Sequence, residues 1–256
     1  MSSGAHSRDP LAHPGHACSS CTHNTERAGS VSFAADGRGR YRKAEVTGPL
    51  SRMVNVRPLQ PRDIDALYAI SLATGLAGGD ASSLYRDRKL MGHIYSAPYA
   101  SLQPELCLVS EDDAGVAGFV AGTSDTRTWE RRLEQEWWPQ LRRQYPAPDQ
   151  AHMAEWSHDQ RRIFMIHNPK PIPAAVVQSY PSHLHMNLLP RLQGRGTGSH
   201  MFAAWLAMAA TRGIGPLHVG VNRENLPAIG FWYRLGFVEL DIPEDRAGRT
   251  VWMGRA

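Results

Sequence analysis

Leu188-Leu189-Pro190-Arg191-Leu192-Gln193-Gly194-Arg195-Gly196-Thr197-Gly198 is the stretch of this 256-residue sequence that decides the fold. It follows a strand-like run, 182–189, and precedes a helix-forming run, 200–211, so it is predicted to be a strand-to-helix turn. Alternating glycines have no β-carbon and let several backbone N–H groups point into one concavity at the positive end of the helix dipole. The stretch therefore predicts a cradle for a diphosphate. An ordinary glycine-rich turn is the alternative interpretation.

A second informative stretch runs from Asn225 to Phe237, after a strand-like run at 217–221. Asn225 suits the N-cap of a helix, Pro227 its first turn, and Gly236 the left-handed position that ends it. This stretch predicts a capped helix followed by a strand.

Both stretches resemble signatures of the GNAT-type N-acetyltransferases. The spacing Arg191-x-x-Gly194-x-Gly196 is similar to their acetyl-CoA motif, in which backbone amides hold the coenzyme's pyrophosphate. The stretch from Asn225 resembles their second signature, Asn-x-x-Ala-x-x-Phe-Tyr-x-x-x-Gly-Phe. The resemblance implies an α+β fold: a central, mixed but mostly antiparallel, twisted sheet flanked by helices.

Composition narrows the class of protein. With 42% hydrophobic and 20% charged residues, the chain can form one good core. It has no apolar run long enough to span a bilayer, and its N-terminus lacks the apolar centre of a signal peptide, so we expect a soluble, cytoplasmic protein with no membrane partner. Residues 1–52 hold seven Lys or Arg and four Asp or Glu, which accounts for three of the four net positive charges. The nearly neutral remainder disfavours nucleic-acid binding.

Residues 1–52 are predicted to be a disordered tail, because they are rich in Ser, Gly, His and Ala and show no periodicity. The tail contains a Cys-x-x-Cys, Cys18 and Cys21, with histidines beside it, a combination that can bind zinc. A second ligand pair anchored in a fold is missing, so we interpret the cluster as accidental and expect no metal. The acetyltransferase domain is predicted to cover residues 53–256.

The first half of this domain alternates between strand and helix patterns. Residues 54–59 alternate like an edge strand, 61–70 have helical spacing after a proline, and a second helix is expected at 82–95. Two strands, 105–111 and 115–122, are joined by a turn at Asp112-Asp113-Ala114 and predict a hairpin.

Between 126 and 181 lies a segment longer than a compact domain of this kind needs, so a helical insertion is expected between the third and fourth strands. A stripe of apolar residues predicts a helix that Pro139 kinks or divides. A further helical patch is expected at 151–164. Around this segment Gly118-Phe119-Val120-Ala121-Gly122, Trp138-Pro139 and Tyr180-Pro181-Ser182 resemble the acetyltransferase-like C-terminal domain of O-GlcNAcase and its free-standing bacterial relatives. No counterpart of the glycosidase domain is expected.

The resemblance implies acetyl-CoA as cosubstrate and a set of binding residues. Backbone N–H groups at Leu188 or Leu189 are expected to contact the thioester and pantetheine, and Asn225 the pantetheine. The complete expected set is Leu188, Leu189, Arg191, Gln193, Gly194, Arg195, Gly196, Thr197, Gly198, Asn225 and Trp232.

A general base is needed to deprotonate the acceptor amine. His183 and His185 share one face of the strand at 182–189, and histidine titrates near neutrality. The pair resembles the paired histidines of aralkylamine N-acetyltransferases, one residue out of register, which a β-bulge would correct. Asp125 is a third candidate. The alternatives are that the histidines pack beneath helices and that Asp125 caps a loop.

The acid that protonates the leaving thiolate is a tyrosine in the family, where this sequence has Trp232. An indole N–H cannot deliver a proton at neutral pH. Tyr233 is about 100° around the helix and is the candidate acid.

Two classes of function therefore stay open. The first is an acetyl-CoA-dependent N-acetyltransferase that acts on a small amine or a protein lysine. The second is a catalytically silent, acetyltransferase-like binding module. The glycine cradle favours the first and Trp232 the second. The acceptor is not identified by the sequence, and a homodimer is left open.

Overall fold

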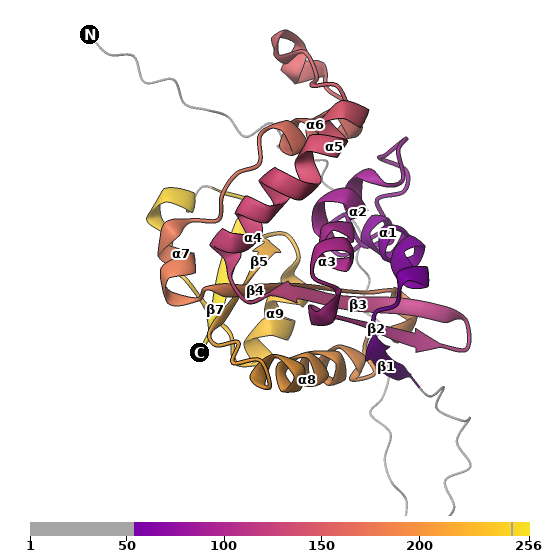
Figure 1. Cartoon of the computed structure of the whole chain (residues 1–256), viewed down its shortest axis with the longest axis vertical. Coiled ribbons are helices and arrows are strands. Elements are labelled where there is room, and N and C mark those ends of the chain that lie inside the picture. The colour runs from indigo at the N-terminus through magenta and orange to yellow at the C-terminus, as the bar shows by residue number, and fades with distance from the viewer. Residues whose placement is uncertain (1–53, 247) are drawn as a thin grey trace, which may run out of the picture. The chain divides into compact units, whose positions relative to one another are not determined.

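The computed structural model describes residues 54–246 and 248–256. The predicted tail, its cysteines and the start of the domain at Met53 lie outside these residues. Within them, the chain alternates strands and helices in the order that an α+β domain requires, and Figure 1 shows one sheet with helices on both of its faces.

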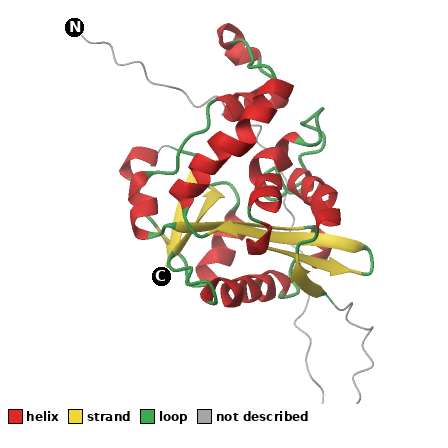
Figure 2. Ribbon diagram, in the orientation of Figure 1, coloured by secondary structure: helices red, strands yellow, loops and turns green. Residues whose placement is uncertain are grey.

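Seven strands form this single sheet, in the order β1-β2-β3-β4-β5-β7-β6. Figure 2 shows them as yellow ribbons between red helices. Only β4 and β5 pair in parallel, and every other neighbouring pair is antiparallel. The predicted mixed, mostly antiparallel sheet is therefore confirmed. The strands are β1 Asn55–Pro58, β2 Cys107–Asp112, β3 Gly115–Thr123, β4 Ser182–Leu188, β5 Leu217–Asn222, β6 Val238–Glu239 and β7 Thr250–Arg255.

The two faces of the sheet carry different cores. Successive side chains of a strand point to opposite faces. On β4, Leu184 joins a large apolar cluster with Trp205 of α8 (Thr197–Ala210) and Trp232 of α9 (Leu226–Arg234). His183 points the other way, toward Tyr99 of α3 (Ala97–Leu102). In Figure 1, α8 and α9 lie below the sheet and α1 to α6 above it.

The helix expected at 82–95 is shorter than predicted. After α1 (Ile64–Ala73), residues 74–89 form turns and bends, and α2 covers only Leu90–Tyr95. Asp80 and Asp87 each accept a hydrogen bond from a backbone N–H two residues on, which competes with helical hydrogen bonding.

The helical insertion between β3 and β4 is confirmed. Its first helical run comprises α4 (Thr126–Arg132), a π-helical turn (Leu133–Trp137) and α5 (Trp138–Gln144). The disturbance expected at Pro139 takes the form of this π turn, because proline has no N–H for the normal bond and its ring crowds the preceding turn.

The second part of the insertion differs in detail from the prediction. A 3₁₀ helix, Gln150–Glu155, precedes α6, which covers His158–His167. Ser157 and Gln160 form a capping box that sets the start of α6. A short helix that the sequence did not predict, α7 (Ala174–Ser179), then leads into β4.

Candidate functional site

The glycine stretch forms a turn between β4 and α8, as predicted. Gly194 and Gly196 have φ angles of +70° and +80°, in the left-handed region that favours glycine. A β-carbon at either position would meet nothing within 4 Å, so open space lies over both. Gly196 is the N-cap of α8 and makes no side-chain cap, and the first N–H groups of a helix have no partner within it. The turn therefore presents backbone donors and the positive end of α8 to an anion.

Gly198 has a different role from the two glycines before it. A β-carbon there would approach Phe231 to 3.1 Å and Leu188 to 3.3 Å. It is buried in the first turn of α8, where the helix passes close to α9 and to the end of β4. This glycine allows close packing, which holds the N-terminus of α8 beside the strand end.

Two polar side chains of the turn, Arg191 and Gln193, form hydrogen bonds with other parts of the chain. The Nε of Arg191 donates to Asp112 over 3.0 Å, and its Nη2 donates to the Gly115 carbonyl over 3.2 Å. Both acceptors belong to the β2–β3 hairpin, so the arginine fixes the turn against it. Gln193 donates to the Leu188 carbonyl over 2.7 Å. Arg195 is exposed, whereas Thr197 is buried.

β4 and β5 separate soon after they begin. Their parallel pairing covers only Ser182 with Leu217 and His183 with His218, although β4 continues to Leu188. The gap between the diverging strands opens toward the glycine turn. The resemblance to the acetyltransferase fold implies this splayed strand end.

The backbone geometry distinguishes the two leucines at this end. The N–H of Leu189 donates to the Ala117 carbonyl of the neighbouring chain segment over 2.8 Å. Since N–H groups of successive strand residues point to opposite edges, the N–H of Leu188 points away from β3 and toward the gap. Of the two predicted backbone donors, Leu188 is the one that faces the gap.

Asn225 caps α9 by accepting a hydrogen bond from the Ala228 N–H over 3.2 Å. Its side chain also lies against Gly78, whose added β-carbon would come within 3.1 Å of the Asn225 amide nitrogen. Gly78 belongs to the loop between α1 and α2, so this loop reaches the N-terminus of α9.

Trp232 and Tyr233 lie in different surroundings, one buried and one exposed. Trp232 is buried and packs edge-on against Phe202 and Phe237. Tyr233 is 47% exposed, and its hydroxyl donates to Glu239 of β6 over 3.2 Å. Partial desolvation of the hydroxyl, followed by its hydrogen bond to the Glu239 carboxylate, raises the pKa of Tyr233. Phe231, between the turn of α8 and α9, is the aromatic residue of this signature that contacts the cradle.

His183 is held by hydrogen bonds at both ring nitrogens. The Thr126 hydroxyl is 2.7 Å from the Pro181 carbonyl and 2.7 Å from Nδ1 of His183. Because the carbonyl can only accept, Thr126 donates to it and accepts from Nδ1–H. Nε2 is then the acceptor, and the Tyr99 hydroxyl donates to it over 2.6 Å. The histidine is thus a neutral tautomer without a free lone pair.

His185 lies two residues along the same face and is partly exposed. Its ring contacts Tyr95 and Tyr99 edge-on, at centroid separations of 6.0 and 5.4 Å. Within residues 54–246 and 248–256, no group hydrogen-bonds its nitrogens. Of the two predicted histidines, His185 is therefore the one whose ring nitrogens have no hydrogen-bond partner among the described residues. The β3–β4 register is continuous through both, so the bulge considered from the sequence is absent there.

Packing changes the protonation of the whole histidine group. Burial, followed by the charges of neighbouring histidines, lowers the pKa of His183 well below its usual value. The same causes lower the pKa of His185 to about 4. Burial also lowers the pKa of His218 to about 4, against the opposing effect of its hydrogen bond to the Tyr180 carbonyl. All three rings are neutral at pH 7.

Asp125 is the N-cap of α4. Its carboxylate accepts a hydrogen bond from the Thr128 N–H over 2.7 Å, and this bond is the main reason that its pKa is lowered. The capping role considered from the sequence accounts for this residue, because the hydrogen bond from Thr128 occupies its carboxylate.

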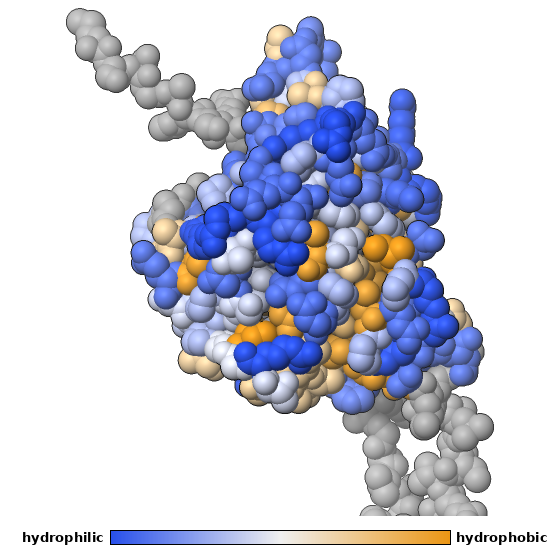
Figure 3. Space-filling model, in the orientation of Figure 1, coloured by the Kyte–Doolittle hydropathy of each residue, from blue (hydrophilic) through white to orange (hydrophobic). Residues whose placement is uncertain are grey.

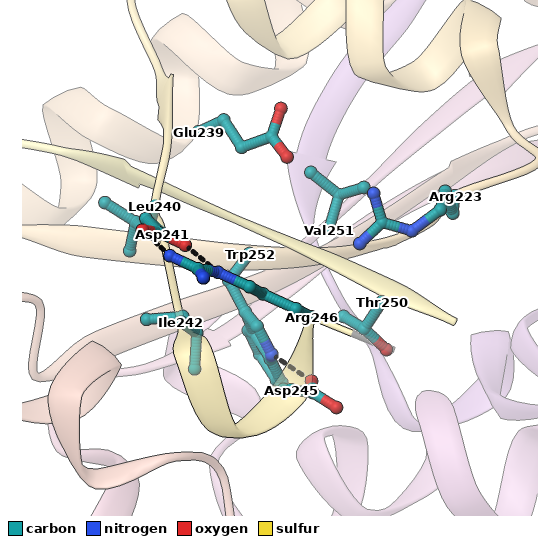
Figure 4. Close-up of a pocket in the computed structure, with 10 residues that line it drawn as sticks. All are labelled: Arg223, Glu239, Leu240, Asp241, Ile242, Asp245, Arg246, Thr250, Val251 and Trp252. Carbon is teal, nitrogen blue, oxygen red and sulfur yellow. Dashed lines mark hydrogen bonds and ion pairs between the residues drawn. The ribbon is translucent and has the colours of Figure 1, made fainter. Parts of the chain in front are cut away.

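A pocket of about 260 Å³ lies elsewhere, lined by β6, β7 and the segment that joins them, together with Arg223 (Figure 4). None of the predicted site residues lines it. Two pairs of its polar groups bind each other: Arg246 pairs with Asp241, and Trp252 donates to Asp245. In the part of the chain that the structure describes, no cluster of His, Cys, Asp or Glu could hold a metal ion, and no helix is long and apolar enough to cross a membrane.

The splayed parallel pair, the glycine turn and the mixed sheet together define an acetyltransferase fold. The sequence model described as the Acetyltransferase (GNAT) family matches residues 130–237. The crystal structure of SsHAT matches with 34% sequence identity and a TM-score of 0.72, over 79% of this chain and 97% of that one. The chain belongs to the GNAT acetyltransferase family.

Two curated relatives show a more particular similarity. Protein O-GlcNAcase of Rattus norvegicus is 23% identical over 214 residues, and that of Mus musculus is 22% identical over 209 residues. Each match covers 81% of this chain and 22% of the relative, so the chain spans about a fifth of their length.

Several residues near the site were not identified as functional from the sequence. They are Tyr95, Tyr99 and Thr126 around the histidines, His218 beneath them, and Gly78 against Asn225. Each comes from a separate element, and none carries a local pattern that distinguishes it from an ordinary core residue.

Proposed function

We propose that this protein is an acetyl-CoA-dependent N-acetyltransferase that transfers an acetyl group to an amine acceptor in a ternary complex. The observation that carries the proposal is the combination of the open glycine turn, at the N-terminus of α8, with the gap between β4 and β5. A backbone with two left-handed glycines under open space suits a diphosphate, and the gap suits an extended pantetheine chain.

The residues present fit acetyl-CoA as a cosubstrate. Backbone N–H groups of Gly194 to Gly198 would hold the pyrophosphate, and the exposed Arg195 adds positive charge there. The N–H of Leu188 would bind the carbonyl oxygen of the thioester, and Asn225 the pantetheine. Arg191 and Gln193 would act through the turn, since their side chains are bonded to the hairpin and to Leu188. Bound acetyl-CoA supplies an acetyl group activated as a thioester.

His185 is the proposed base. Its low pKa keeps it neutral at pH 7, so it can accept a proton from the acceptor ammonium, directly or through water. His183 is a positioning residue in this proposal, because both of its nitrogens are hydrogen-bonded. Its ring contacts the His185 ring at a centroid separation of 6.0 Å.

Solvent is the proposed source of the proton for the leaving thiolate. Trp232 is buried among apolar rings, and the Tyr233 hydroxyl is bound to Glu239 on the exposed side of α9. A CoA thiolate is a good leaving group, so a missing side-chain acid slows turnover without abolishing it.

A second candidate function is a catalytically silent binding module. It is favoured by Trp232 at the position where the family signature has tyrosine, and by the O-GlcNAcase relatives, in which the matched region is a fifth of a longer protein. The two functions differ in whether bound acetyl-CoA is consumed.

Calorimetric titration with acetyl-CoA, followed by a thiol-release assay against a panel of amines and lysine peptides, separates these functions. Micromolar binding with amine-dependent release of CoA is expected. Binding without turnover on any amine would favour the silent module, and an absence of binding would overturn the assignment of the cradle.

A further inference from the structure

A half-buried arginine of the insertion contacts Tyr95, whose ring also contacts the proposed base His185. Arg162, on α6, donates from Nε to the Tyr85 hydroxyl over 2.9 Å and from Nη1 to the Tyr95 hydroxyl over 2.8 Å. Its guanidinium carbon lies 5.5 Å from the centroid of the Tyr95 ring. The insertion thus brings a positive charge onto α2 from a position 67 residues farther along the chain.

Arg162 has no carboxylate partner among the described residues. Other arginines in similar surroundings are paired: Arg57 binds Asp63 and Glu111, and Arg142 binds Glu134. Taking a guanidinium out of water without an anion is unfavourable, since two neutral hydroxyls replace only part of its hydration. The arrangement is therefore suited to an anion that arrives with a ligand.

The polar groups around this guanidinium can all donate to such an anion. Each tyrosine hydroxyl accepts from Arg162 and keeps its own hydrogen to donate. Nη2 of Arg162 makes no hydrogen bond within the described part of the chain. Three donors with one net positive charge match a carboxylate.

Tyr95 connects this cluster to the proposed base. Its ring contacts Arg162 on one side and lies 6.0 Å, centroid to centroid, from the His185 ring. The distance from the guanidinium carbon to the centroid of the His185 ring is at most the sum of these two distances to the Tyr95 ring. A small molecule that carries both an amine and an anion is therefore long enough to span the two groups.

Figure 3 shows hydrophilic surface over the α4–α6 insertion, with hydrophobic patches in the area of α1 to α3. α6 packs directly against α2 and α5.

We propose that Arg162, with Tyr85 and Tyr95, binds a carboxylate of the acceptor, so that the substrates are small amines that carry a carboxylate. This proposal rests on the acetyltransferase function proposed above. It assigns Arg162 to acceptor specificity and gives the insertion a functional reason.

The test compares amines in pairs that differ only in the carboxylate: 5-aminopentanoate with pentylamine, and L-phenylalanine with 2-phenylethylamine. 2-Aminoethyl phosphate and ethanolamine form a phosphate pair. Wild type, Arg162→Gln and Arg162→Lys are assayed for acetyl transfer, and acetyl-CoA affinity is measured separately by calorimetry. Arg143→Gln removes the same charge from an exposed position on α5 and is the matched control.

The wild type should prefer the carboxylated member by about 10- to 100-fold in kcat/KM. Arg162→Gln should lose this preference through a higher KM for the acceptor, with unchanged affinity for acetyl-CoA. Arg162→Lys should keep part of it, because it retains the charge without the planar fork. Arg143→Gln should behave as wild type.

Equal rates for both members of each pair, a preference that survives Arg162→Gln, or a preference for the phosphate pair alone would overturn this proposal and leave the acetyltransferase function standing. A wild type that does not bind acetyl-CoA would overturn both. Should Arg162→Gln fail to fold, Tyr95→Phe keeps the ring and removes one donor, and it should lower the preference by about 3- to 10-fold.

Discussion

The two parts of the proposed site differ in what they are made of. On the α8–α9 side, the proposed coenzyme site is made of backbone: the turn at Gly194 and Gly196, the N-terminus of α8 and the N–H of Leu188. On the side of α1 to α6, the proposed acceptor site is made of side chains: His185 and the tyrosines around it, with Arg162 supplied by the insertion.

This difference has a physical basis. A diphosphate and a pantetheine chain are the same for every acceptor, and backbone groups fixed by a turn can hold them with little demand on side chains. An acceptor varies, and side chains carried on an insertion can change without disturbing the sheet. The face made of backbone is therefore expected to be sensitive to any added side chain, and the other face to particular functional groups.

The largest expected effect is at Gly196. In Gly196→Asp the carboxylate occupies the open space over the turn, binds the free N–H groups at the helix start, and repels the pyrophosphate. Calorimetry should detect no acetyl-CoA binding. Gly213→Asp is the matched control, since Gly213 follows the other end of α8 with φ of +66° and equally open space. If Gly196→Asp binds acetyl-CoA as well as the wild type does, the glycine stretch is an ordinary turn and not a diphosphate site.

The next effect tests the opposite face. His185→Ala should lower kcat/KM by on the order of 10²–10⁴, because the proposed base is removed. In the wild type, kcat/KM should fall as the pH approaches about 4, where His185 becomes protonated. This fall should vanish in the variant. His200→Ala, at an exposed position on α8, is the control. Identical profiles for His185→Ala and wild type would move the role to Asp125 or to solvent.

A smaller effect concerns stability against acid. The folded pKa of His218 is about 4, below the value of about 6.5 in an unfolded chain, so only the unfolded state takes up its proton between these values. Stability is therefore complete above pH 6.5 and is lost as the pH falls toward 4, by up to ~3 kcal/mol from this residue.

Denaturant unfolding at pH 7, 5.5 and 4.5 measures this loss. His218→Asn keeps a donor for the Tyr180 carbonyl and removes the titration, so its stability should depend less on pH. His200→Asn should leave the dependence unchanged. If the free energy of unfolding depends on pH equally in His218→Asn and in the wild type, the His218 ring does not contribute to the acid sensitivity.

The smallest effect is expected at Tyr233. Tyr233→Phe removes the hydroxyl that donates to Glu239, at an exposed position, and should change kcat by less than about twofold. Steady-state kinetics with a stability check measures it. A tenfold loss at unchanged stability would make Tyr233 the acid, and Trp232→Tyr should then be neutral or faster.

The main features of the fold were predictable because each depends on residues that are close together in the sequence. The turn at Gly194 to Gly198, the cap at Asn225 and the hairpin around Asp112 each depend on neighbouring residues, and each is found where it was expected. The helix at 82–95 was predicted too long, because side chains of Asp80 and Asp87 bind the backbone and break its hydrogen bonding.

The candidate site was predictable only in part. The sequence places His183 and His185 on one strand face. Because both are histidines, it gives no reason to choose one over the other as the base. The partners of the two rings come from other elements: Tyr99 and Thr126 occupy both nitrogens of His183 and leave His185 free. A single strand does not contain this information.

The sequence by itself determined the class of fold, the position of the glycine turn and the departure from the family signature at Trp232, because glycine spacing and strand alternation act over a few residues. The tertiary structure decided which leucine N–H faces the gap, which histidine keeps a lone pair, and that Arg162 reaches Tyr95. These depend on strand divergence, hydrogen-bond direction and helix packing, which join residues tens of positions apart. Such contacts form only in the folded chain, where helices and strands from distant parts of the sequence pack together.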